Sequence, residues 1–127
     1  MHRFSCRVYY EDTDLAGIVY YANYLKFIER ARSEWVRDLG IDQNQMKEQG
    51  IVFAVRRIEA DYIAPARFDD LLDVVTSVAS KTAARLVLDQ TVLCHDQVLF
   101  NAKVTLVAMG LDGRPTRLPP ILQALGV

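Results

Sequence analysis

Residues Tyr10 to Arg37 read YEDTDLAGIVYYANYLKFIERARSEWVR, and this segment contains the main helical pattern of the chain. Apolar residues recur there at helical spacing, which predicts a buried amphipathic helix from about Asn23 to Leu39, capped by Asn23 and ended by Gly40. These positions are Tyr24, Phe27, Ile28, Ala31, Trp35 and Leu39. Unpaired N–H groups at a helix start can polarise a carbonyl, so the carboxylates and glycine turn directly before it indicate a reaction centre.

Composition limits the class of protein. The 127 residues are 51% hydrophobic, enough for one cored domain spanning 1–127. A net charge of −1 gives no basic field, so we expect no nucleic-acid partner. Cys6 and Cys94 are too few for a disulfide framework and lack metal-site spacing, which suits a reducing compartment. Met1 to Arg7 has no apolar core of signal-peptide length, and no apolar run approaches about 18 residues, so we expect a cytoplasmic protein.

The rest of the chain predicts mainly strands. Arg3 to Tyr10 reads as a first strand, followed by a loop over Glu11 to Ala22. After the long helix, Ile41 to Gln49 is a weaker helical segment with Asp42 as its cap. Segments rich in β-branched and aromatic residues or with alternating apolar residues then predict four strands. They are Ile51–Ala64, Leu71–Val78, Arg85–Cys94 and Val98–Met109.

These elements predict an α+β fold in which an antiparallel sheet of about five strands wraps one long central helix. The short polar breaks at Ser80–Thr82 and His95–Gln97 suit hairpins rather than crossovers. Such a sheet has open edges and a second face, and the tail at Leu118–Leu122 is too short to cover them. We therefore expect a homo-oligomer, a dimer or tetramer, with a polar-faced monomer as the alternative.

Three blocks carry a resemblance to a known family: RVYYEDTD at 7–14, ERAR at 29–32 and DYIAPARFDD at 61–70. With these blocks, in this order over nearly the whole chain, the sequence resembles hotdog-fold acyl-CoA thioesterases of the 4-hydroxybenzoyl-CoA thioesterase superfamily. It is most similar to their Tol-Pal-associated branch. The resemblance implies the hotdog fold, paired subunits that share a continuous sheet, and active sites at the dimer interface.

The resemblance also implies roles for two residues. The family's catalytic carboxylate, the second Asp of an Asp-x-Asp pair, falls on Asp14. The backbone N–H that activates the thioester carbonyl, two residues before the helix-capping Asn, falls on Tyr21. The Tol-Pal-associated branch usually has His at this position and the 4-hydroxybenzoyl-CoA branch an aromatic residue. Tyr21 therefore keeps the backbone donor and has no imidazole.

Thioester hydrolysis needs a base or nucleophile near the carbonyl carbon and hydrogen-bond donors near the developing oxyanion. Asp14 can activate a water molecule or attack the carbonyl to give a mixed anhydride, and the residues leave both routes open. We expect no separate cofactor, because CoA is part of the substrate. We also expect no metal ion. Expected substrate contacts are Gly17, Ile18, Val19, Asn23 and Glu29. Candidate cations for the CoA phosphates are Arg57, Arg67, Lys81 and Arg85, with Arg56 also considered.

Other interpretations of the same residues stay open. Asp14 is also a residue type that stabilises turns by local hydrogen bonding. A dehydratase or hydratase needs a His–carboxylate pair, but His2 and His95 fall at a terminus and in a predicted turn. A third class is an acyl-binding or scaffold module that engages a Tol-Pal or lipid-synthesis protein. Within the thioesterase class, the Pro65–Arg67 block favours an aliphatic acyl group and Tyr21 an aromatic one.

Overall fold

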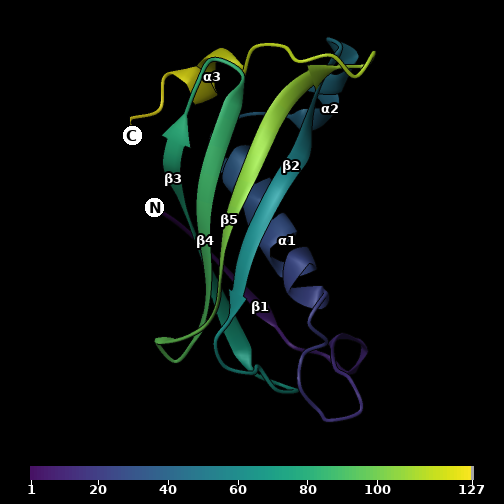
Figure 1. Ribbon diagram of the computed structural model, residues 1–127, viewed down its shortest axis with the longest axis vertical. Coiled ribbons are helices and arrows are strands. Elements are labelled where there is room, and N and C mark those ends of the chain that lie inside the picture. The colour runs from purple at the N-terminus through teal and green to yellow at the C-terminus, as the bar shows by residue number, and fades with distance from the viewer. Residues whose placement is uncertain (127) are drawn as a thin grey trace.

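The computed structural model describes residues 1–126 and contains a five-stranded antiparallel sheet around one long helix (Figure 1). The order of strands across the sheet is β1-β3-β4-β5-β2, and every neighbouring pair is antiparallel. This arrangement confirms the predicted hotdog architecture. The strands are β1 (His2–Arg7), β2 (Ile51–Tyr62), β3 (Leu71–Lys81), β4 (Arg85–Cys94) and β5 (Gln97–Gly110).

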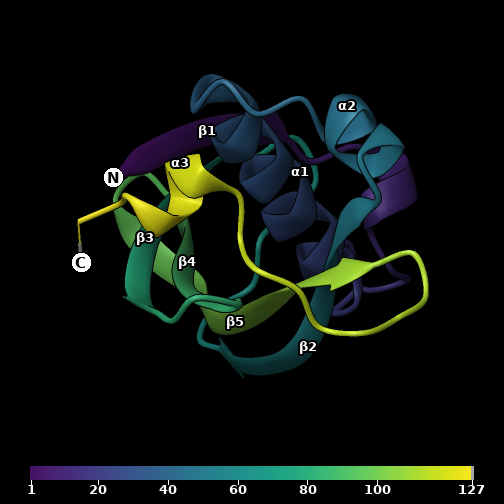
Figure 2. The same cartoon turned by 90° about the horizontal axis from the view of Figure 1, so that it is seen from above.

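Helix α1 (Asn23–Asp38) lies in the hollow of the curved sheet, as the view from above shows (Figure 2). Its buried stripe meets the inward-facing residues of β3, β4 and β5, which alternate with more exposed ones along each strand. The buried stripe of α1 consists of Tyr24, Phe27, Ile28, Ala31, Trp35 and Val36. None of the described helices has the length and hydrophobicity that a bilayer span requires.

Two short helices complete the fold. The predicted second helix is confirmed as α2 (Gln43–Glu48), where Asp42 Oδ1 accepts the N–H groups of Asn44 at 2.8 Å and Gln45 at 3.3 Å. Gly40 adopts φ +89° between α1 and α2, a backbone conformation that favours glycine and ends α1 as predicted. Helix α3 (Pro120–Gln123) packs Leu122 into one end of the core.

The region between β1 and α1 differs from the prediction in two places. β1 ends at Arg7, because the Asp12 carboxylate accepts the Tyr9 N–H at 2.8 Å and the chain turns into the 3₁₀ helix η1 (Tyr10–Asp12). The prediction that Asn23 caps α1 is wrong, since Ala22 occupies the cap position. The Asn23 amide is instead a donor to the Asp12 carbonyl at 2.9 Å, which ties the helix to the preceding loop.

Candidate active site

A tight turn after η1 presents Asp14. The Gly17 N–H donates to the Asp14 carbonyl at 3.0 Å, and the Asp14 N–H donates to the Ile18 carbonyl at 2.9 Å. Gly17 has φ +79°, so a residue with a side chain would be strained at this position. The turn is braced against the segment after β2, because the Val19 N–H donates to the Ala66 carbonyl at 2.8 Å. The backbone therefore holds Asp14 at a defined place.

The Asp14 side chain is exposed and only partly engaged. Its Oδ1 accepts the Ala16 N–H at 2.9 Å, which is the local bond expected of a turn residue. Its Oδ2 makes no hydrogen bond with the residues that the structure describes. One carboxylate oxygen thus fixes the side chain, and the other remains available to a water molecule or a carbonyl carbon.

Asp14 borders a cavity of about 390 Å³ beside the start of α1. The cavity wall combines this one carboxylate with aromatic and aliphatic groups, a composition that suits an apolar acyl group with a reactive end. Its lining residues are Asp14, Ile18, Val19, Tyr21, Tyr24, Tyr62, Ile63, Ala64 and Pro65.

The turn that leads into α1 has two free backbone donors, and one of its residues, Tyr21, lines this cavity. The Tyr20 carbonyl accepts the Asn23 N–H at 2.8 Å, and the Tyr21 carbonyl accepts the Tyr62 hydroxyl at 2.9 Å. The N–H groups of Tyr21 and Ala22 donate to no other group among residues 1–126. Free N–H groups at the positive end of a 16-residue helix can stabilise negative charge.

The predicted substrate-contact residues fall into two groups. Ile18 and Val19 line the Asp14 cavity, whereas Gly17 and Asn23 shape the backbone around it without lining it. Glu29 lies further along α1 and borders two other cavities, of about 450 and 230 Å³, between α1 and β2. A single protomer therefore does not bring Glu29 to the Asp14 cavity.

The candidate cations are dispersed. Arg57 pairs with Glu59 at 2.8 Å, and the Lys81 ammonium donates to the carbonyls of Gln123 and Leu125. Arg67 is exposed, and its backbone bridges to Ile18 next to the Asp14 cavity. Arg85, together with Arg56, borders a cavity of about 510 Å³ formed with residues of β5 and the loop after it.

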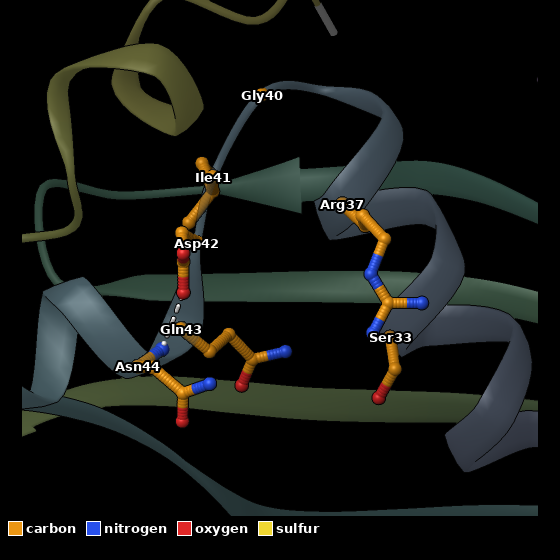
Figure 3. A pocket seen from close by; sticks show the side chains of 7 residues that line it. All are labelled: Ser33, Arg37, Gly40, Ile41, Asp42, Gln43 and Asn44. Atoms are coloured by element: carbon orange, nitrogen blue, oxygen red, sulfur yellow. Dashed lines mark hydrogen bonds between the residues drawn. The ribbon is translucent and has the colours of Figure 1, made fainter.

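A further cavity, of about 430 Å³, lies where α1 meets α2 (Figure 3). Ser33 and Arg37 of α1 face Gln43 and Asn44 across it. Its one carboxylate, Asp42, caps α2 through Oδ1, and Arg37 pairs with Glu34. In Figure 1 the start of α1 and α2 lie at opposite ends of the molecule, so this cavity is remote from Asp14.

Sequence reasoning missed the contribution of the last residue of β2 and the segment after it. Tyr62, Ile63, Ala64 and Pro65 form one wall of the Asp14 cavity. Their signal was present in the DYIAPARFDD block, but nothing in its local pattern places it beside a loop about 45 residues earlier.

Neither cysteine is placed to act as a nucleophile at this site. Neither Cys6 nor Cys94 lines the Asp14 cavity. Burial raises the pKa of the Cys6 thiol to about 11, so very little thiolate exists at neutral pH.

Comparisons with known proteins agree with the fold and identify the family. Residues 8–125 match the model of the thioesterase-like superfamily, and the chain belongs to this family. It is 38% identical over 126 residues to the acyl-CoA thioester hydrolase YbgC of Escherichia coli O6:H1, covering 98% of this chain and 94% of the relative. It is also 38% identical to the acyl-CoA thioesterase YbgC of Haemophilus influenzae, covering 95% of this chain and 90% of the relative.

A solved structure gives the same result. The probable thioesterase from Bartonella henselae superposes with a TM-score of 0.90 at 38% sequence identity. The superposition covers 93% of this chain and 98% of that one. The resemblance identified in the sequence is thereby confirmed at the level of the family and its fold.

Proposed function

We propose that this protein hydrolyses acyl-CoA to a free acid and CoA, with Asp14 as general base or nucleophile. The observation that carries the proposal is a cavity lined by both Asp14 and Tyr21, in a chain of the thioesterase-like superfamily. The names of the relatives, acyl-CoA thioester hydrolase and acyl-CoA thioesterase, support the substrate class.

Asp14 and the Tyr21 turn have different roles in the proposed reaction. The Tyr21 N–H donates a hydrogen bond that polarises the thioester carbonyl and then stabilises the oxyanion. The positive end of α1 adds to this stabilisation. Either Asp14 removes a proton from the attacking water, or its carboxylate attacks the carbonyl carbon and water opens the resulting anhydride. CoA leaves as a thiolate, which needs no strong general acid. His2 and His95 do not line the cavity, so a His-dependent dehydratase mechanism has no support there.

We propose an aliphatic acyl group, because the Pro65–Arg67 block resembles the Tol-Pal-associated branch and Ile18, Val19 and Ile63 line the cavity. An aromatic acyl group is the alternative that Tyr21 favours. The test is thiol release from a panel of short aliphatic, long aliphatic and 4-hydroxybenzoyl-CoA substrates. Aliphatic substrates should give the higher kcat/KM. A wide margin for 4-hydroxybenzoyl-CoA would contradict the aliphatic assignment, and no thiol release from any substrate would contradict the hydrolase.

We propose that the active form is an oligomer of at least two chains, and we favour a tetramer. β2 is an edge strand with exposed apolar side chains at Val55 and Tyr62, so its open edge invites pairing with a second copy. A two-fold axis would place the Tyr62 end of one β2 beside the Ile51 end of its partner. The partner's Arg85 and Arg56 would then lie nearer the Asp14 cavity, where they could bind CoA phosphates.

The oligomer proposal predicts a concentration-dependent enzyme. Light scattering at micromolar concentration should give a mass at least twice that of one chain. Specific activity should fall on dilution through the dissociation range, because each site needs two chains. A mass of one chain with full activity would contradict this assembly.

We also propose a cytoplasmic location and a secondary protein partner. The cysteine usage supports a cytoplasmic location. The similarity to the Tol-Pal-associated branch supports a secondary contact with a Tol-Pal or lipid-synthesis protein, which co-purification from the native host would test.

A further inference from the structure

Tyr62 links the sheet to the turn that precedes α1. It is the last residue of β2, and its hydroxyl donates to the Tyr21 carbonyl at 2.9 Å, across 41 positions of sequence. Tyr62 also lines the Asp14 cavity. Its side chain therefore contacts the backbone of the residue whose N–H we propose as the oxyanion donor.

Two successive peptide groups of this turn are fixed through their carbonyls. A peptide group is planar, so fixing its carbonyl also fixes the direction of its N–H. The Asn23 N–H holds the Tyr20 carbonyl at 2.8 Å and thereby the Tyr21 N–H on the same peptide. The Tyr62 hydroxyl holds the next peptide, between Tyr21 and Ala22. Without this second bond, only the connection to α1 orients the peptide between Tyr21 and Ala22. The two torsion angles of Tyr21, which join this peptide to the one that carries the Tyr21 N–H, are then less restricted.

The Tyr62 ring has a rigid support. Its centroid lies 5.1 Å from that of Phe100 and 5.6 Å from that of Tyr24, both in edge-on geometry. Tyr24 and Phe100 are buried and stack at 4.9 Å with an interplanar angle of 10°. The Tyr24 hydroxyl accepts the Ala66 N–H at 3.1 Å. The ring of Tyr62, although partly exposed, therefore packs against two buried aromatic residues.

The Tyr62 hydroxyl also keeps its proton under ordinary conditions. Desolvation, with a smaller contribution from Tyr21, raises the pKa of Tyr62 above its usual value. The group is therefore a hydrogen-bond donor at neutral pH.

We propose that Tyr62 is a positioning residue that holds the Tyr21 turn in the orientation required to stabilise the oxyanion. This inference rests on the proposed thioester hydrolysis and on the Tyr21 N–H as its donor. An aligned donor acts mainly in the transition state, so the hydroxyl should affect kcat more than KM.

The direct test is Tyr62→Phe, which keeps the ring and removes one oxygen atom. We expect kcat to fall about 10-fold with KM within about twofold of wild type. Two unreactive ligands separate positioning from cavity shape: a ketone analogue of acyl-CoA, which keeps the carbonyl, and a thioether analogue, which lacks it. Affinity for the ketone should fall about fivefold and affinity for the thioether should not change.

Two control variants remove a tyrosine hydroxyl elsewhere. Tyr10→Phe alters a residue that is 79% exposed and does not line the cavity, and it should leave kcat and both affinities unchanged. Tyr24→Phe removes the acceptor for the Ala66 N–H within the same aromatic cluster. It should lower the unfolding midpoint without changing the ratio of ketone to thioether affinity.

The outcomes distinguish the role of Tyr62 from the proposed thioester hydrolysis on which it rests. If Tyr62→Phe matches wild type in kcat and both affinities while Asp14→Asn is inactive, the inference is wrong and the proposed function stands. An equal loss of affinity for the ketone and the thioether would show that Tyr62 shapes the cavity. Unfolding of Tyr62→Phe would show that Tyr62 is needed for stability. Both results contradict the inference. Normal hydrolysis by Asp14→Asn would instead contradict the proposed function.

Discussion

Asp14→Asn should lower kcat by about 100-fold or more, the usual scale for removing a general base. The substitution keeps the size of the side chain and an oxygen that can still accept the Ala16 N–H, so the turn should persist. It removes the negative charge that either activates water or attacks the carbonyl. Thiol release at saturating acyl-CoA gives kcat, and circular dichroism together with light scattering checks that the variant remains folded and assembled.

Asp12→Asn is the matched control for this result. Asp12 is 7% exposed, and its carboxylate accepts the Tyr9 N–H at 2.8 Å, so its role is to shape η1. The Asn variant retains an acceptor oxygen there, and kcat should stay within about threefold of wild type. The assignment of Asp14 is falsified if folded, oligomeric Asp14→Asn hydrolyses normally while Asp12→Asn is inactive.

Phe100→Ala should lower the free energy of unfolding by about 3–5 kcal/mol, the range for deleting a buried aromatic side chain. Phe100 is fully buried on β5, where it stacks on Tyr24 and contacts the edge of Tyr62. Its loss leaves a cavity directly beneath the candidate site. Urea denaturation measures the change as a lower midpoint at constant slope.

The exposed aromatic pair provides the comparison for Phe100. Phe68 stacks on Tyr10 at 4.3 Å but is 42% exposed, so Phe68→Ala should cost no more than about 1.5 kcal/mol. A loss below about 1 kcal/mol for Phe100→Ala would show that the aromatic cluster is not the support that we infer for Tyr62.

The helix and the sheet could be predicted because their signals are local. The apolar spacing from Tyr24 to Trp35 is set by one face of one helix, and the alternation in Val98–Met109 by one side of one strand. The failure at Asn23 has a different cause. An Asn side chain can accept a hydrogen bond from its own helix or donate one to another segment. Asn23 donates to the Asp12 carbonyl, 11 residues earlier, and this contact is not visible in the local pattern.

The candidate site was only partly predictable for the same reason. Asp14 and Tyr21 lie in one short segment whose pattern resembles a known family, so the sequence placed them together. Tyr62 contacts the site through a hydrogen bond that spans 41 positions of sequence. Lys81 is not a free cation, because its ammonium group donates to carbonyls that include that of Leu125. Such contacts depend on how the sheet folds back, which residue spacing does not encode.

A crystal structure of the Asp14→Asn protein with an uncleaved acyl-CoA would test the assignments of Asp14 and Tyr21 together. We expect the thioester carbonyl oxygen within about 3 Å of the Tyr21 N–H, and its carbon facing the substituted side chain at position 14. The acyl group should occupy the cavity walled by Tyr24, Tyr62 and Ile63. A thioester bound in another cavity, such as the one between α1 and α2, or a carbonyl with no contact to the Tyr21 turn, would contradict the account.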